Sequence, residues 1–408
     1  MQRLNVMLTL PDGQRMLCGE IFTTTPDLRG KIEGSFRYTK EYLAHPDAFA
    51  LDPEHLPLSP ADVATQRSQG VHGVFEDALP DDWGRELLSR KWNIPRSEQT
   101  VPNFLKFLGS NGLGALSFYT DKEKPYLDPS GNLHDLSRLV DAALNYDAGL
   151  PVEADDLRTL FSCGSSPGGA RPKALIKNKA GMLWIAKFPK LNDKYHVEPI
   201  EAASLQLARD AGLQVPDFLI QNAGNRKVLL VERFDVTAQG GRNHMISMQT
   251  LLGADGYYNL SYSDMFTVIN KYSYRPQEDT NKLFRQMVFN TAIGNTDDHL
   301  KNFCLLHTAK GFRLSPAYDL VPDIHHNREH RLSFPQGAGT LPPGRQVLQR
   351  IGKVQKVSDP EQIIEDVVQS MAKWQAVFWQ YEVPENDIQR LAPGISQRLK
   401  RIEDPPIE

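Results

Sequence analysis

The sequence predicts an α+β protein with a strand-rich first part and a helical last part. Short segments of alternating polarity, separated by turn residues, fill much of the first 235 residues. Beyond residue 235, apolar residues recur at helical spacing instead. A chain of 408 residues exceeds the size at which a single core stops growing, so we expect more than one unit. We divide the chain into a strand-rich part, a mixed middle part and a helical part, at 1–120, 121–235 and 236–408.

Composition argues against several classes of protein. Apolar residues make up 40% of the chain and charged residues 24%, and no apolar run approaches the ~20 residues that span a membrane. The formal net charge of −4, with scattered lysines and arginines, gives no basic patch for direct DNA binding. Cys18, Cys163 and Cys304 are far apart and odd in number, so neither a disulfide framework nor a cysteine metal site is expected. Since the N-terminus also lacks the apolar stretch of a secretory signal, we expect a cytoplasmic protein without a membrane anchor.

Three strands and a turn open the chain. Residues 4–10, 14–22 and 31–38 alternate partly between apolar and polar side chains, and the Pro-Asp-Gly sequence at 11–13 is typical of a turn. A helix is expected within 75–92, because the apolar residues there return at helical spacing.

A loop of small residues opens the next group of elements. Ser165, Ser166, Gly168 and Gly169 precede an expected strand at 173–177. Glycines let backbone amides approach a phosphate closely, and successive amides make an anion site. The loop is neither a Walker A motif nor a complete G-x-G-x-x-G. A flexible linker is therefore the alternative interpretation.

Lys187 lies in the second of two expected strands, 173–177 and 182–188, that are joined by a good turn sequence. It shares a strand face with apolar residues, so it needs an anionic partner if it is buried. Glu201 lies on the core side of the following helix and is the expected partner, with Glu198 as its competitor. A lysine that extends from the strand end into solvent is the alternative.

Glu232, Phe234 and Asp235 follow a buried-type strand at 228–231, between the middle and helical parts. In a nucleotide-binding protein with its cleft at this junction, Phe234 would pack on the base and Asp235 would reach the ribose. Only the position of this segment in the sequence supports a role in nucleotide binding. The alternative is an interdomain connector without a binding role.

The helical part carries the most informative pattern of the chain. Asp297 stands five residues before Asn302, and Asp319 follows 17 residues later, beyond two short apolar strands and a turn. A hairpin brings its ends together, so Asn302 and Asp319 are expected to converge. Mg²⁺ takes such oxygen ligands and is usually held by one or two side chains plus phosphates. Asp297 is then placed to accept the proton of an incoming hydroxyl, and the set predicts phosphoryl transfer.

Other kinds of site are less supported. Asp323, His325, His326 and His330 are of metal-binding types, but no helix or further ligand is evident, and we interpret them as loop residues. A Ser-His-Asp triad cannot be assembled from local motifs, and no G-x-S-x-G elbow is present. A Lys-Glu pair together with two metal ligands is the arrangement of protein kinases, so we expect a two-lobed, protein-kinase-like fold.

Several motifs in the same order resemble the HipA family of serine/threonine kinases, the toxins of HipA-HipB toxin-antitoxin modules. They are GSSPGGARPKALI, WIAKFP, EAASLQLARDAGL, VERFD, NTDDHLKNF and LSPAYDLVP, and they run from about Phe161 to Pro322. The first part of the chain resembles the N-terminal subdomain of that family more loosely.

The resemblance implies ATP and Mg²⁺ as ligands, with the following roles: Lys187 on phosphate, Glu232 and Phe234 at adenine, Asp235 near the ribose, Asp297 as the catalytic residue, and Asn302 and Asp319 as metal ligands. It also implies that a loop serine is itself phosphorylated, which displaces the loop and inactivates the kinase. Ser166, seven residues before Lys173, is the expected serine, and Ser165 is the alternative.

The family further implies partners. These are a HipB-like helix-turn-helix antitoxin that takes the kinase to operator DNA, and a protein target in translation such as an aminoacyl-tRNA synthetase. Two alternatives stay open. One is a catalytically weak relative that acts mainly as an antitoxin-bound corepressor, and the other is a small-molecule kinase of similar fold, which uses the same spacing of acids and amide.

Overall fold

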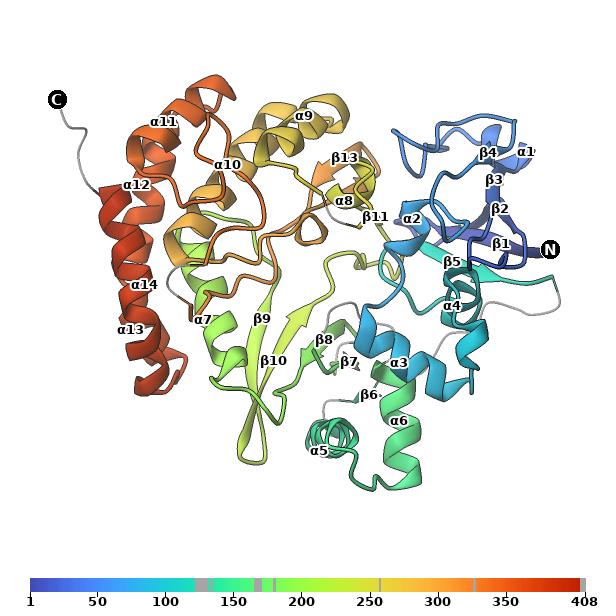
Figure 1. Cartoon of the computed structure of the whole chain (residues 1–408), viewed down its shortest axis with the longest axis horizontal. Helices are drawn as coiled ribbons and strands as arrows, with labels where there is room; N and C mark the ends of the chain where they lie inside the picture. Colours follow the sequence, from blue (N-terminus) through green and yellow to red (C-terminus); the bar gives the residue numbers. More distant parts are fainter. Residues whose placement is uncertain are drawn as a thin grey trace. The chain divides into compact units, whose positions relative to one another are not determined.

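The computed structural model describes residues 1–121, 131–132, 135–164, 171–178, 181–256, 258–325 and 328–403 (Figure 1). The chain forms two compact units. Unit 1 comprises Met1–Leu191, Glu232–Asp255 and Leu306–Ala309, and unit 2 comprises Asn192–Val231, Gly256–Leu305 and Lys310–Glu408. The predicted division into three parts at 120 and 235 stays a prediction.

Unit 1 opens with a five-stranded antiparallel sheet in the order β4-β3-β2-β1-β5. Its strands are β1 Gln2–Thr9, β2 Arg15–Thr23, β3 Gly34–Tyr38, β4 Val63–Ala64 and β5 Leu116–Tyr119. The three strands expected from alternation are confirmed as β1, β2 and β3. The pairing of β1 with β2 shifts by one residue after Val6, opposite Gly19. A Cβ on Gly19 would lie 2.1 Å from a ring carbon of Phe36, so this position requires glycine.

The helices of unit 1 are short. They are α1 Lys40–Leu43, α2 Gly73–Glu76, α3 Asp82–Lys91, η1 Arg96–Glu98, α4 Val101–Leu108, α5 Leu136–Asp147, α6 Ala154–Gly164 and α8 Met248–Leu251. The helix expected within 75–92 is α3. The indole nitrogen of Trp83 donates to a carboxylate oxygen of Asp147 at 2.9 Å, which ties α3 to α5.

Unit 1 contains further strands, one of which carries Lys187, the predicted phosphate-binding lysine. They are β6 Gly131–Asn132, β7 Lys173–Lys177, β8 Leu183–Lys187 and β11 His244–Ser247. Strands β7 and β8 pair antiparallel, as expected from the turn between them. In unit 2, β9 Phe218–Ala223 pairs antiparallel with β10 Arg226–Glu232. The expected strand at 228–231 is thus part of β10.

Unit 2 is mainly helical. Its helices are α7 Val197–Asp210, α9 Tyr262–Tyr272, α10 Pro276–Ile293, η3 Leu300–Asn302, α11 Arg345–Val354, α12 Pro360–Met371, α13 Trp374–Gln380 and α14 Glu385–Glu403. Helix α10 packs against α9, α12 and α14, and its apolar residues Leu283 and Met287 are fully buried. The last helix, α14, contains Pro393 within its length.

A hairpin follows η3, formed by β12 Cys304–Thr308 and β13 Gly311–Leu314. It confirms the two short strands expected between Asn302 and Asp319. Within the described ranges of the chain, no helix is long and apolar enough to cross a bilayer.

Candidate active site

Helix α10 delivers the loop that carries Asp297. Gly294 ends the helix in the left-handed conformation, with φ 81°. The amides of Gly294 and Asn295 both donate to the carbonyl of Asn290 at 3.0 Å, which closes the last turn. The left-handed conformation favours glycine here, and a Cβ on Gly294 would lie 3.0 Å from the Arg398 side chain, which would then have to shift.

Asp297 presents its carboxylate to solvent. Its side chain is 58% exposed, and one carboxylate oxygen forms an ion pair with Nε of Arg331 at 2.8 Å. Asn302 is mostly buried and donates from its amide nitrogen to the main-chain carbonyl of Asp297 at 3.2 Å. The acid and the amide, five residues apart in sequence, are therefore parts of one compact loop.

The two ends of the hairpin meet as the sequence predicted. The amide of Ser315 donates to the carbonyl of Cys304 at 2.9 Å. The Tyr318 hydroxyl donates to the carbonyl of Lys301 at 2.7 Å and lies 3.0 Å from the Cys304 sulfur. Tyr318 and Lys301 each precede a predicted metal ligand, so this contact brings the backbone near Asp319 to the backbone near Asn302.

Asp319 adopts a positive φ of 58°, which is uncommon for a residue other than glycine. Such conformations persist only where surrounding structure holds them, and they gather at functional sites. The half-buried Asp319 follows directly on the Tyr318 contact. No sequence pattern indicated this backbone conformation.

A buried acid that sequence analysis missed anchors the hairpin. Asp279, near the start of α10, is fully buried and accepts from the Arg313 guanidinium at 2.9 and 3.0 Å. It also accepts from the backbone amide of Leu314 at 2.9 Å and from the Ser273 hydroxyl at 2.6 Å. Strand β13 is thereby fixed to the helix that delivers Asp297.

Asp298, the neighbour of Asp297, was also missed. It is 1% exposed, and its carboxylate accepts from the hydroxyl of Tyr262, the ring of His330 and the backbone amide of Arg331. His330 is therefore a buried hydrogen-bonding residue and not a solvated loop residue. The described residues contain no cluster of three or more acidic, histidine or cysteine side chains suited to a metal ion.

In unit 1, Lys187 is directly opposite Lys173 in the antiparallel pair of β7 and β8. Directly opposite residues project from the same face of a sheet, so both ammonium groups lie on one face. Lys173 is only 6% exposed and Lys187 is half-buried. Like charges directly opposite each other destabilise a sheet unless anions lie near them. Lys173 is therefore a further candidate for binding phosphate, which sequence analysis did not name.

The segment Glu232–Asp235 lies beside β8, where the amide of Arg233 donates to the carbonyl of Leu183 at 3.0 Å. Glu232 and Phe234 are half-exposed, whereas Asp235 is 3% exposed.

Both oxygens of Asp235 are occupied. One accepts from Nε of Arg233 at 3.0 Å, and the other accepts from the amide of Gly114 at 2.8 Å and lies 3.5 Å from the Arg242 guanidinium. Burial alone would raise the pKa of Asp235, but the adjacent charge and hydrogen bonds of Arg233, with the charge of Arg242, lower it. This geometry favours a structural role, and contact with a ribose stays a prediction.

Glu198 and Glu201 lie on α7 in unit 2, and each is 3% exposed. The burial of Glu201 agrees with the helix pattern, which made no prediction about the burial of Glu198. The pairing of either with Lys187 stays a prediction. Ser165, Ser166, Gly168 and Gly169 lie outside the described residues, as does His326.

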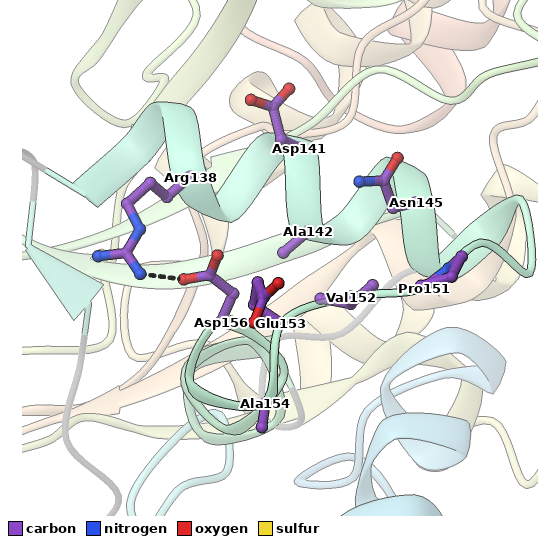
Figure 2. A pocket seen from close by; sticks show the side chains of 9 residues that line it. All are labelled: Arg138, Asp141, Ala142, Asn145, Pro151, Val152, Glu153, Ala154 and Asp156. Carbon is purple, nitrogen blue, oxygen red and sulfur yellow. Dashed lines mark hydrogen bonds and ion pairs between the residues drawn. The ribbon is translucent and has the colours of Figure 1, made fainter.

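A cavity of about 280 Å³ lies between α5 and the start of α6 in unit 1 (Figure 2). Arg138 and Asp156 form an ion pair of 2.6 Å at one end of it, and Asp141, Asn145 and Glu153 add polar groups. None of the predicted site residues lines this cavity.

Comparison with known proteins identifies related chains. The family model "HipA-like C-terminal domain" matches residues 165–375, and the model "HipA N-terminal domain" matches residues 18–119. The serine/threonine-protein kinase toxin HipA of Shewanella oneidensis is 24% identical over 73% of this chain and 72% of its own length. Y4mE of Sinorhizobium fredii, whose name describes a candidate kinase, is 31% identical over 34% of each chain, so this match spans about a third of that relative.

A solved structure has the same fold. It comes from the toxin-antitoxin system of Shewanella oneidensis MR-1 and was determined as a complex of HipA, HipB and operator DNA. The match has a TM-score of 0.68 at 19% identity and covers 97% of both chains. The expected α+β, kinase-like fold is thus confirmed.

Proposed function

This chain belongs to the HipA family, and we propose that it is an ATP-dependent serine/threonine protein kinase. The observation that carries the proposal is the loop that contains Asp297, together with the two ends of the hairpin. There an exposed carboxylate, a buried amide and a second acid are held together by the contacts of Asn302 with Asp297 and of Tyr318 with Lys301. Positioning and charge stabilisation are the main tasks of a protein in phosphoryl transfer.

The phosphates of ATP have a matching cation pair in unit 1. Lys173 and Lys187 project from one face of β7 and β8, and ammonium groups form strong charge-assisted hydrogen bonds with phosphate oxygens. In this proposal Lys187 contacts the α- and β-phosphates, and the buried Glu201, with Glu198 as the alternative, orients the ammonium group. Glu232 and Phe234 bind the adenine, and Asp235 holds that segment in place.

The residues around the hairpin fit a magnesium ion. Asn302 uses its amide nitrogen on the carbonyl of Asp297, so its amide oxygen is the group left for a cation. Asp319 adds a carboxylate, and two such ligands suffice because Mg²⁺ retains waters and phosphate oxygens. When bound, Mg²⁺ would neutralise charge on the phosphates and polarise them.

Asp297 is the acceptor of the proton in the transfer step. It orients the hydroxyl of a serine or threonine, takes its proton as the new oxygen–phosphorus bond forms, and ADP leaves as the bond to the β-phosphate oxygen breaks. With one oxygen on Arg331, the second oxygen of Asp297 is the one that meets the hydroxyl.

Purified protein incubated with labelled ATP and Mg²⁺ tests the proposal. Asp297→Ala should abolish label transfer, and its stability should change little because the side chain is exposed. Glu361→Ala is the matched control, since Glu361 is a similarly exposed acid of unit 2 that pairs with Arg345. Label transfer that persists in Asp297→Ala would refute the assigned role.

We also propose that the kinase phosphorylates itself on Ser166, or on its neighbour Ser165. Support comes from the position of these residues in the small-residue loop before Lys173. Mass spectrometry of protein incubated with ATP should find one phosphate within residues 164–173. Ser166→Ala and Ser165→Ala, tested separately, assign it.

The proposed partners are a HipB-like helix-turn-helix antitoxin and, as target, a component of translation such as an aminoacyl-tRNA synthetase. The related HipA was solved together with HipB and operator DNA, which supports the first. In this proposal the kinase reaches DNA only through the antitoxin. Expression without the antitoxin should arrest growth, and Asp319→Ala should relieve the arrest. Arrest that is unchanged in Asp319→Ala would contradict a kinase toxin.

A further inference from the structure

Asp298 is fully hydrogen-bonded in a buried position. Its Oδ2 accepts from the Tyr262 hydroxyl at 2.8 Å and from Nδ1 of His330 at 3.0 Å. Its Oδ1 accepts from the backbone amides of Arg331 at 2.9 Å and Leu332 at 3.4 Å. The carboxylate thus joins helix α9 to the segment 328–332, and none of its donors is a solvent-exposed side chain.

The opposite side of His330 contacts the last helix. A guanidinium nitrogen of Arg398, on α14, lies 3.2 Å from Nε2 of His330. Arginine can only donate, so Nε2 must accept and the proton of the neutral ring must sit on Nδ1, facing Asp298. Arg398, His330 and Asp298 are each at most 5% exposed. They form a buried chain from a cation, through a neutral imidazole of fixed tautomer, to a carboxylate.

This series of hydrogen-bonded side chains, Arg398, His330 and Asp298, ends at the residues that hold Asp297. The amide of Arg331 is fixed by Asp298 and also donates to the carbonyl of Thr296 at 3.2 Å. The side chain of the same Arg331 carries the ion pair to Asp297. Arg398 also donates to the carbonyl of Arg328 at 3.3 Å, so the segment is held at both ends.

We propose that Asp298 is the positioning residue of this site. Together with His330 and Arg398, it fixes the segment 328–332. Arg331 therefore stays on one oxygen of Asp297, and the other oxygen is directed to the acceptor hydroxyl. The inference rests on the proposed kinase function. It assigns distinct tasks to two adjacent acids, since Asp297 touches substrate and Asp298 acts through Arg331. It also makes α14 part of the support of the site.

Asp298→Asn tests this role with almost no change of shape. The amide group offers a donor where four donors already converge, so the segment loses at least one of its hydrogen bonds. We expect kcat to fall about 10- to 100-fold, as misplacement of a catalytic group by about 1 Å does. The KM for ATP should stay within twofold, because Asp298 has no part in nucleotide binding.

Asp387→Asn is the matched control. Asp387 is a buried acid on helix α14, which also carries Arg398, and its carboxylate accepts from the exposed ring of His196 at 2.8 Å, so it provides an Asp-His contact away from the loop. It should lower the melting temperature while kcat stays within twofold. A fall in kcat equal to that of Asp298→Asn would show that general loss of stability explains both, and would overturn the inference.

Arg398→Met covers the case in which Asp298→Asn fails to fold. It removes the guanidinium group, which is the outer end of this series of hydrogen bonds, and keeps an unbranched apolar side chain. We expect kcat to fall by about three- to tenfold with an unchanged KM for ATP, since the segment keeps its bonds to Asp298. An unchanged kcat in folded Arg398→Met would overturn the role of the chain.

Hydrogen exchange separates this inference from the kinase proposal. The amides of Arg331 and Leu332 should exchange faster in Asp298→Asn than in the wild type, and at the wild-type rate in Asp387→Asn. If the wild type transfers no phosphate but this pattern is found, the kinase proposal fails and the structural link stands. If exchange of the two amides is equal in wild type and Asp298→Asn, the inference is wrong whatever the activity.

Discussion

Asp297 and Asp298 are neighbours with opposite environments. The side chain of Asp297 is 58% exposed and that of Asp298 is fully buried. Nothing in the sequence of the loop distinguishes them except the spacing of Asp297 from Asn302. The donors that capture Asp298 come from residues at least 32 positions away in the chain, so its role follows from tertiary structure alone.

The two opposed lysines lead to a prediction about nucleotide binding. Lys173→Ala and Lys187→Ala should each raise the Kd for the nucleotide about tenfold or more, because a charge-assisted hydrogen bond contributes about 1.5–3 kcal/mol. Lys177→Ala is the control, since Lys177 is an exposed lysine at the other end of β7. Isothermal titration with a non-hydrolysable ATP analogue measures the effect. Equal affinity of Lys173→Ala and wild type would remove Lys173 from the site.

Gly294 leads to a prediction about stability. Gly294→Ala should lower the free energy of unfolding by more than the roughly 1–2 kcal/mol that a left-handed backbone costs, because its Cβ would also press on Arg398. Gly224→Ala isolates the backbone contribution, since Gly224 also has a positive φ and an added Cβ there would meet no atom within 4 Å. Denaturant unfolding of both variants measures the difference. Equal losses would contradict the contact with Arg398.

At the scale of elements, the hairpin β12–β13 positions the proposed metal ligands. Its strands were predictable because apolar residues and a turn follow one another within a dozen residues. Its attachment was not, because Asp279 and Tyr318 bind it through partners that no local pattern reveals.

Tyr318→Phe tests the hairpin. Loss of the hydroxyl removes a donor to the Lys301 carbonyl, which costs about 0.5–1.5 kcal/mol because the bond is exposed to solvent, and it loosens the backbone that carries Asn302 and Asp319. The Mg²⁺ concentration for half-maximal activity should rise several-fold. Tyr381→Phe is the control, because it removes a hydroxyl bonded to Gln206 on another part of unit 2. The same Mg²⁺ dependence in both variants would contradict the role of Tyr318.

At the scale of the whole molecule, unit 1 buries neutral histidines. Burial lowers the pKa of His72 to about 4 and that of His244 to about 4. Below pH 6.5 the unfolded chain takes up these protons and the folded chain does not, so acid favours unfolding until the pH reaches the folded pKa. Stability should therefore fall between pH 6.5 and 4 by about 1.4 kcal/mol per pH unit for each of these groups.

Denaturant midpoints measured from pH 7.5 to 4.5 check this prediction. His72→Gln should be less stable at pH 7.5 but should lose stability less steeply below pH 6.5, since one proton-linked group is gone. An identical slope in wild type and His72→Gln would show that His72 is not protonated in this range on unfolding.

The sequence by itself determined the local elements and the identity of the candidate residues. Alternation predicted β1, β2 and β3, helical spacing predicted α3, and the separation of Asn302 from Asp319 predicted their hairpin. These signals are short-range, because turns, strands and helices are specified by neighbours in the chain.

Only the tertiary structure decided which of these side chains are exposed to solvent and which are buried in structural hydrogen bonds. It turned Asp298 inward and Asp297 outward, buried Asp235 against Arg233 and the amide of Gly114, 121 residues away, and set Lys173 opposite Lys187. Burial and hydrogen-bond partners depend on segments that are distant in sequence, so no periodicity or motif encodes them locally. Chemistry at this site follows from which polar groups the fold has already satisfied and which it leaves exposed.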